Sequence, residues 1–251
     1  MDIERYRDRN SREQHEAQQA LAALLNDTAS RAGFDPAGLS IQWSGDGGFA
    51  VLPAGVPSGE VTERFIEELH VALANRNARR RPTPWTHIRL RLSVHEGPIR
   101  MDGATGRSGP PAVEVTGLVN ADPLRAALAA CPGAYLGVIV SARIFDDYLN
   151  DGYGSLSPAE FRPVRVSLKG HVRTAYVYVP GIDLFAIGEL DHYDPDRAEA
   201  GDGDAGGAAA APPEGAQRIV YGSAHTITDS NVSETHQGDI NVGGVSFGGS
   251  R

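Results

Sequence analysis

Hydrophobic residues recur at helical spacing near the start of the chain. Between residues 17 and 32, alanine, leucine and threonine side chains stand three or four positions apart. Asn10 or Ser11 precedes them, with Glu13 or Gln14 at the distance that a capping box requires. This pattern predicts an amphipathic helix that begins near residue 11.

A glycine-rich turn lies between two short apolar stretches further along. Residues 39–43 and 49–52 are rich in residues that favour strands, and they flank the turn 45–48, whose glycines accept positive φ angles. The sequence therefore predicts a β-hairpin with Asp46 at its tip. Helical spacing returns over residues 58–73, which predicts a second amphipathic helix.

The second half of the pattern contains more strands than helices. Apolar residues alternate strictly over 88–95, and Gly97 permits a turn into 99–101, which predicts a second hairpin. The further predicted elements are a helix over 112–130, a strand over 135–140, a short helix over 142–149, and a strand pair over 164–168 and 174–179. Hairpins outnumber strict βαβ crossovers, so the prediction is an α+β fold with a ferredoxin-like core: one mostly antiparallel sheet with helices packed on it.

Composition changes after the last strand pair. Residues 183–217 are rich in Ala, Gly, Pro and acidic residues, and we expect a disordered linker because they offer too little apolar surface to offset the entropy of ordering. Residues 218–251 are short β-prone pieces separated by Gly, Asn and Ser. They resemble segments that stack into cross-β assemblies, so one interpretation is self-assembly or recruitment of an effector, whereas composition alone favours a disordered polar tail. Residues 1–182 are the predicted folded domain.

Charge and cysteine content narrow the choice of partners. The chain has 23 basic and 32 acidic residues, a net charge of −9, which argues against nucleic acid or an anionic membrane as a partner. Cys131 is the single cysteine, so no intrachain disulfide forms and a reducing compartment fits. No apolar run approaches the roughly 20 residues that cross a bilayer. We expect a cytoplasmic protein without a membrane partner.

Five short motifs occur in the order that is typical of one enzyme family. They are Asp-Ile-Glu-Arg-Tyr at 2–6, Gly-Asp-Gly at 45–47, Val-His-Glu-Gly at 94–97, Ala-Val-Glu at 112–114 and Val-Ser-Leu-Lys-Gly at 166–170. Over about residues 1–180 the chain resembles the catalytic domain of class III nucleotidyl (adenylate or guanylate) cyclases, as a divergent bacterial member. Pyrimidine cyclases of bacterial anti-phage systems share this fold.

The resemblance implies a nucleoside triphosphate as ligand and a set of residues that hold it. Asp2 and Asp46 would bind two Mg²⁺ or Mn²⁺ ions, which neutralise charge on the triphosphate. The expected nucleotide-binding residues are Ile3, Glu4, Arg5, Tyr6, Lys169 and His171. An active enzyme of this kind is a phosphorus–oxygen lyase that forms a cyclic nucleotide. The residues near position 42 do not specify which base it would take.

Two positions depart from the family pattern. In class III cyclases an Asn and an Arg one helical turn apart come from the other subunit of a head-to-tail dimer, and here Glu114 and Leu118 stand in their places. A guanidinium on a transferring phosphoryl group is worth roughly 10³ to 10⁵ in rate, and a neutral donor roughly 10² to 10³. The resemblance therefore implies a degenerate homodimer, or a heterodimer with another cyclase-like chain. Arg107 and Arg125 flank the region as candidate substitutes.

Two alternatives stay open at this point. One is an active cyclase that uses unusual residues, and the other is a non-catalytic dimeric scaffold that acts through its C-terminal tail. A strand that ends at Asp2 has almost no apolar residues before it, so a start codon further upstream is a separate expectation.

Overall fold

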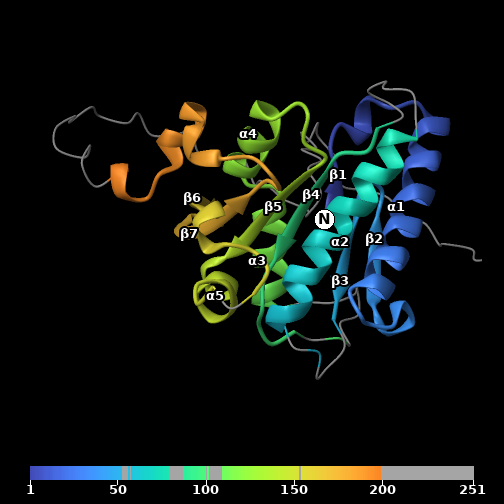
Figure 1. The fold of residues 1–251 in the computed structure, drawn as a ribbon, viewed down its shortest axis with the longest axis horizontal. Coiled ribbons are helices and arrows are strands. Elements are labelled where there is room, and N and C mark those ends of the chain that lie inside the picture. The colour runs from blue at the N-terminus through green and yellow to red at the C-terminus, as the bar shows by residue number, and fades with distance from the viewer. Residues whose placement is uncertain are drawn as a thin grey trace, which may run out of the picture. The chain divides into compact units, whose positions relative to one another are not determined.

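A seven-stranded sheet organises the folded part of the chain (Figure 1). The computed structural model describes residues 1–52, 56, 58–79, 87–99, 101, 109–152 and 154–198. The strands are β1 Asp2–Ile3, β2 Ser40–Ser44, β3 Gly47–Val51, β4 Leu90–Val94, β5 Leu136–Ser141, β6 Arg162–Leu168 and β7 His171–Tyr178, in the order β2-β3-β1-β4-β5-β7-β6. Only β4 and β5 are parallel neighbours, which confirms the expected α+β fold with a mostly antiparallel sheet.

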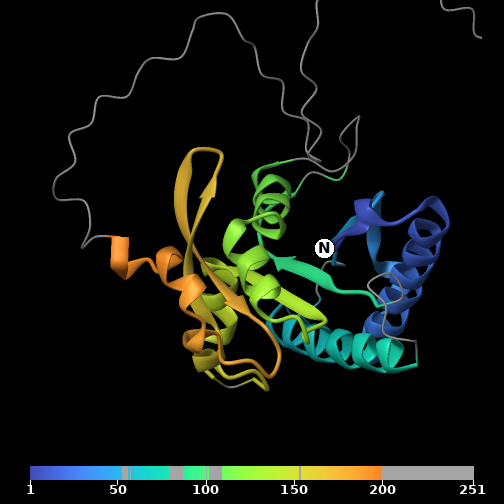
Figure 2. The same ribbon diagram turned by 90° about the horizontal axis from the view of Figure 1, so that it is seen from above.

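Helices pack on both faces of this sheet. They are α1 Ser11–Arg31, α2 Ser58–Ala78, α3 Pro110–Val119, α4 Asp122–Ala130 and the short α5 Ala142–Ile144, which continues as a π-helical turn over Phe145–Leu149. Six 3₁₀ turns complete the described part: Tyr6–Asp8, Pro36–Gly38, Pro158–Glu160, Leu184–Ala186, Gly188–Tyr193 and Asp196–Ala198. Figure 2 shows α2 and α3 on opposite sides of β4.

Strand register assigns side chains to the two faces, because residues directly opposite each other on neighbouring strands share a face. Ile3 lies opposite Leu90, and both belong to the core beneath α1 and α2. Asp2 lies opposite Arg91, so these two side chains lie on the other face. On that face a second core cluster, which includes Ile139 of β5, packs against α4. The sheet is thus a middle layer between two helical layers at β4 and β5.

The first helix begins as its sequence predicts. Asn10 is the N-cap: its side chain accepts a hydrogen bond from the backbone N–H of Glu13, and the Glu13 carboxylate accepts one from the backbone N–H of Asn10. This reciprocal pair satisfies two of the N–H groups that the first helical turn leaves without partners. The capping box is therefore confirmed, with Asn10 rather than Ser11 as the cap.

Two predicted elements differ in the structure. The single helix expected over 112–130 is two helices, since α3 ends at Val119 and α4 starts at Asp122. Pro123 explains the break, because proline has no N–H group to donate to the carbonyl of Val119, as a continuous helix would require, and its ring would clash with that carbonyl. The strand expected over 99–101 is also wrong for the residues described there, and β4 ends at Val94.

The folded domain extends past residue 182. Residues 183–198, which composition assigned to the linker, form three 3₁₀ turns, and the middle one, Gly188–Tyr193, packs against α4 and β6. Leu184 and Leu190 are fully buried there, and the guanidinium of Arg162 donates to the carbonyls of Leu184 and Ile187. Arg162 also pairs with Asp191 at 2.8 Å. The acidic residues of this short stretch therefore include one that anchors it to the sheet.

The remainder of the expected linker and the whole of the β-prone tail, residues 199–251, lie outside the described residues. Arg107 lies outside them too. In the described part of the chain, no helix combines the length and the apolar character needed to cross a membrane.

Candidate functional site

Asp2 and Asp46 lie on neighbouring elements of the sheet. Asp2 is in β1 opposite Gly47, and the backbone carbonyl of Asp46, in the β2–β3 turn, accepts a hydrogen bond of 2.8 Å from the N–H of Ile3. Burial raises the pKa of the Asp2 carboxyl; the guanidinium of Arg91 opposes this, and the Asp46 carboxylate adds to it. The Asp46 carboxylate is therefore close enough to Asp2 to oppose the ionisation of its carboxyl group.

Gly47 makes this close approach possible. A Cβ atom at Gly47 would lie 2.1 Å from the carbonyl oxygen of Met1 and 2.8 Å from the Cα of Asp2, closer than any real contact. Only glycine lets β3 lie this near β1. The Gly-Asp-Gly motif therefore has a structural reason for its second glycine as well as a candidate functional residue at its centre.

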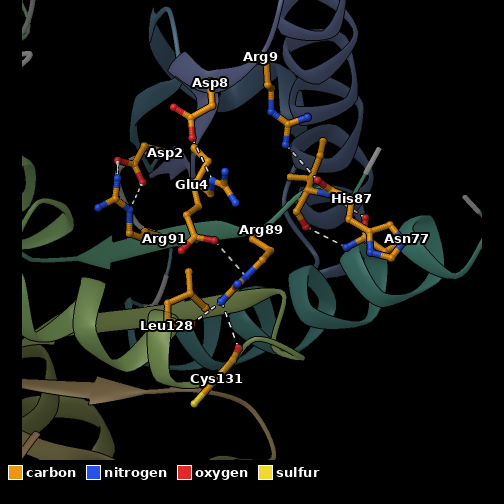
Figure 3. A network of polar contacts seen from close by, with 12 residues as sticks. Asp2, Glu4, Asp8, Arg9, Asn77, His87, Arg89, Arg91, Leu128 and Cys131 are labelled. Carbon is orange, nitrogen blue, oxygen red and sulfur yellow. Dashed lines mark hydrogen bonds and ion pairs between the residues drawn. The ribbon is translucent and has the colours of Figure 1, made fainter. Parts of the chain in front are cut away.

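Arg91 is the direct partner of Asp2, and the sequence pattern alone did not identify it. Its Nε atom donates to Oδ1 of Asp2 at 2.8 Å and its Nη2 atom to Oδ2 at 2.6 Å (Figure 3). Both side chains are nearly buried, at 13% and 10% exposed. The alternation of residues 88–95 places arginines on one face of β4, but the cross-strand register that puts Arg91 opposite Asp2 is a tertiary feature.

The segment after β1 is held by ion pairs. Glu4 pairs with Arg89 at 3.1 Å, and the guanidinium of Arg89 also donates to the carbonyls of Leu128 and Cys131 at the end of α4 (Figure 3). A cation at a helix C-terminus satisfies carbonyls that lack helical partners and favours the helix dipole. Arg89 thus connects the segment that follows Asp2 to α4.

The four residues expected to bind nucleotide after Asp2 have distinct positions. Ile3 is buried in the core beneath α1 and α2, and Tyr6 packs against the same core. Glu4 is engaged by Arg89, while Arg5 has a left-handed backbone and pairs with Asp8 on the surface. Among these four, Arg5 has the most exposed charged side chain.

Glu114 and Leu118 share a face of α3 but differ in surroundings. Leu118 is fully buried in the core beneath α3 and α4. Glu114 is partly buried, 3.8 Å from a nitrogen of Arg173 and 3.9 Å from Nδ1 of His95. Burial lowers the pKa of His95, so its ring is neutral at neutral pH and the 3.9 Å contact is not an ion pair. Arg173 is the cation that Glu114 faces.

Ser141 is the closer neighbour of His95. The hydroxyl of Ser141 lies 2.9 Å from Nδ1 of His95, and it also accepts from the backbone N–H of Ile144 at the start of α5. A nucleophilic serine would need the base on an accessible hydroxyl. Ser141 is buried and caps a helix, so this pair has a structural role.

Lys169 and His171 lie in and beside the tight turn between β6 and β7. Lys169 has φ 49° and Gly170 φ 80°, and Leu168 pairs with His171 across the turn. Two consecutive positive φ angles are typical of a type I′ hairpin turn. In the sheet order, β4 and β5 lie between this hairpin and β1, the strand of Asp2. One chain therefore does not bring Lys169 to the two aspartates.

The expected divalent metal ions do not fit Asp2 as it stands. Both of its oxygens already accept from Arg91, and no group of three or more His, Cys, Asp or Glu residues able to hold a metal occurs among the described residues. A cavity of about 990 Å³ lies between α1 and α2, lined by residues such as Arg9, Glu16 and Arg76, and none of the expected site residues lines it.

Arg125, the second candidate substitute for the missing arginine, is also occupied. It lies on α4, where it donates to Asn120 at 3.0 Å and approaches Asp122 at 3.8 Å. The candidate site therefore consists of Asp2, Asp46 and Arg91. Glu114 and Leu118 lie on α3, which packs on the same face of the sheet but over β4, β5 and β6. No protein-family model, curated protein or solved structure matches this chain.

Proposed function

We propose that residues 1–198 form a class III nucleotide cyclase-like signalling domain that binds a nucleoside triphosphate and lacks catalytic residues of its own. Cyclase activity would then require a second cyclase-like chain. The observation that carries the proposal is the juxtaposition of Asp2 and Asp46 on adjacent elements at one part of the sheet. The motif order along the sequence supports the same family.

The topology of the first four strands supports the proposal. The sheet order β2-β3-β1-β4, with every neighbouring pair antiparallel and α1 and α2 in the connections, is that of the ferredoxin-like split βαβ motif. This motif is the core that the resemblance to class III cyclases implies. Asp2 stands on the central strand of that core.

The surroundings of α3 support the proposal that the domain lacks catalytic residues of its own. Leu118, at the position of the family's arginine, is buried and contributes to a hydrophobic core. Glu114, at the position of the family's asparagine, is a carboxylate that faces Arg173 and would repel a polyanion. Neither a carboxylate nor a leucine side chain can donate a hydrogen bond to a phosphate.

The uneven coverage of the sheet favours a partner chain. Helix α3 contacts β4, β5 and β6, and α4 contacts β5, β6 and β7. On the same face, neither α3 nor α4 makes extensive contact with the half formed by β2, β3 and β1. Asp2, Gln42 and Phe49 belong to this open half. A second copy or another cyclase-like chain would supply the missing layer in a head-to-tail dimer.

The test is incubation of the full-length protein with ATP, GTP, CTP and UTP in turn, in buffer with Mn²⁺. Cyclic products are detected by mass spectrometry, and the midpoint of thermal unfolding is measured in the same samples. We expect no cyclic product from the protein alone and a higher midpoint with at least one nucleotide. Asp46→Ala should remove that shift, whereas Asp27→Ala, which removes an exposed carboxylate of α1, should keep it.

Other results of this test would favour one of the alternative functions or support the need for a partner chain. A cyclic product from the protein alone, lost in Asp46→Ala, would make it an active cyclase. No thermal shift with any nucleotide, with dimerisation intact, would favour a scaffold that acts through its tail. Product that appears only after addition of a cyclase chain with the Asn and Arg residues would support the dependence on a partner.

A further inference from the structure

Asp2 already has a cation in the structure. The planar guanidinium of Arg91 presents two parallel N–H groups to the two carboxylate oxygens, at 2.8 and 2.6 Å. Bidentate arginine–carboxylate pairs are among the strongest side-chain contacts, because both bonds are charge-assisted. Divalent metals bind through the same oxygen atoms. Arg91 and a metal ion at Asp2 therefore compete for one carboxylate.

The strand register holds Arg91 against Asp2, where it competes with a metal ion. Asp2 and Arg91 are directly opposite each other in neighbouring antiparallel strands, and both side chains are nearly buried. Little solvent is present to weaken their attraction, and separating them would leave two charges without partners in a poorly hydrated place. The pair is therefore a built feature of the sheet and not a fluctuating surface contact.

The neighbouring arginine shows that the pairing is specific. Arg89 is two residues before Arg91, directly before β4, and its guanidinium pairs with Glu4 and donates to the carbonyls of Leu128 and Cys131. Each guanidinium thus has its own acidic partner on β1 or directly after it. Arg91 is the guanidinium that holds Asp2, and replacement of Arg89 leaves that contact in place.

We propose that Arg91 occupies the Asp2 carboxylate in place of a divalent metal ion in the nucleotide-free protein, and so excludes metal from this aspartate. The inference deepens the proposed function and rests on it, because it concerns the same aspartate of the same site. It assigns Arg91 as the residue that determines whether the site takes a metal. The expected cofactor is thereby displaced by a side chain of this chain.

The test measures Mn²⁺ binding to the full-length protein without nucleotide, by electron paramagnetic resonance of free Mn²⁺ and by the shift of the thermal unfolding midpoint. Arg91→Gln should gain one saturable site that binds at least about tenfold tighter than any site in the unmodified protein. The double variant Asp2→Asn with Arg91→Gln should lose that site. Arg89→Gln, the matched control, should bind Mn²⁺ like the unmodified protein.

Arg91→Lys keeps the test decisive if Arg91→Gln does not fold, as judged by circular dichroism. A lysine retains the positive charge but contacts one oxygen at a time, so the other oxygen becomes available to Mn²⁺. We expect tighter Mn²⁺ binding than in the unmodified protein, again dependent on Asp2. Unchanged Mn²⁺ binding in the folded variants would overturn the inference, as would an Asp2-dependent Mn²⁺ site of equal strength in the unmodified protein.

Different experimental results would overturn the proposed function and the role of Arg91. A nucleotide-dependent thermal shift in the unmodified protein, together with no new Mn²⁺ site in the Arg91 variants, would leave the proposed function standing and overturn the role of Arg91. A new Asp2-dependent Mn²⁺ site in Arg91→Gln, together with no nucleotide shift in the unmodified protein, would support the role of Arg91 and overturn the nucleotide-binding function.

Discussion

At the scale of single residues, Gly47 sets the position of Asp2. A Cβ atom at this residue would overlap the carbonyl oxygen of Met1 at 2.1 Å, and the overlapped atoms are backbone atoms that cannot rotate away. Gly47→Ala should therefore push β1 from β3 and destabilise the domain by about 1 to 3 kcal/mol, as other overpacked sites do. Urea unfolding followed by circular dichroism measures the change.

Gly45 is the matched control for this prediction. It lies in the same hairpin, but a Cβ atom at Gly45 would have a ring carbon of Tyr6 as its nearest neighbour, at 4.0 Å. Gly45→Ala should therefore change the free energy of unfolding by less than about 0.5 kcal/mol. Equal losses in the two variants would contradict the role of Gly47 in the contact between β1 and β3.

Tyr178 gives the protein a specific sensitivity to alkaline pH. It is buried against Phe161 with ring centroids 4.8 Å apart, and burial raises the pKa of its phenol to about 12. Because the unfolded phenol ionises near pH 10, the contribution of Tyr178 to stability is complete below pH 10 and is lost as the pH rises through 12. That contribution is about 2 to 3 kcal/mol for two pKa units.

Tyr178→Phe isolates this effect, because it keeps the stacked ring and removes the ionisable group. The free energy of unfolding of the unmodified protein should fall more steeply than that of the variant between about pH 9 and pH 12. Urea unfolding at intervals across this range measures both slopes, and effects of other groups cancel in the difference. Parallel slopes would show that Tyr178 ionises normally in the folded protein.

At the scale of elements, the 3₁₀ turns after β7 belong to the folded domain. Leu190 is fully buried in the core that includes Leu118 and Val166. Leu190→Ala should cost about 2 to 5 kcal/mol of unfolding free energy, because it leaves a cavity in a packed core. The exposed neighbour Glu189 is the control, and Glu189→Ala should change stability by less than about 0.5 kcal/mol. A small loss of unfolding free energy in Leu190→Ala would show that this segment belongs to the linker and not to the folded domain.

Local signals explain which elements the sequence predicted. The capping box at Asn10 acts through neighbouring residues, so α1 was predictable. The β2–β3 hairpin was predicted for a different reason from the one the structure shows: its glycines do not adopt positive φ angles, and Gly47 acts through its close contact with β1. The break before Pro123 was also locally encoded, but the apolar spacing of α3 and α4 concealed it. The packing of residues 183–198 was not predictable, since two leucines in an acidic stretch become informative only once a core exists to receive them.

The candidate site was predictable only in part for a similar reason. A motif identifies Asp46 and Asp2 as candidates, but the partner of Asp2 comes from a strand 89 residues away. The side-chain alternation of β4 indicates which face Arg91 occupies and not which residue it faces. Register between β1 and β4 decides that contact, and register depends on the packing of both core faces.

At the scale of the whole molecule, the sheet divides into two halves that differ in coverage. Strands β4, β5, β7 and β6 have helices or 3₁₀ turns on the face of α3 and α4. Among the described residues, α3 and α4 do not extend over the same face of β2, β3 and β1, where the partly exposed aromatic ring of Phe49 and the nearly buried Asp2 lie. The opposite face of this half already packs beneath α1 and α2. The aromatic ring of Phe49 is therefore the feature that makes the other face the surface on which we expect a second copy.

Phe49 and Trp43 lie on opposite faces of the β2–β3 hairpin, so substitutions at these two residues show which face forms the dimer contact. Phe49 lies opposite Gln42, on the open face, whereas Trp43 lies opposite Gly48 on the face of α1, where it is 49% exposed. Phe49→Glu places a charge at the centre of the expected contact and should weaken dimerisation at least about 30-fold, as loss of an interface hot spot does. Trp43→Glu should leave the dimer intact. Sedimentation velocity of the full-length variants measures both, and a dimer that tolerates Phe49→Glu but dissociates in Trp43→Glu would place the contact on the helical side.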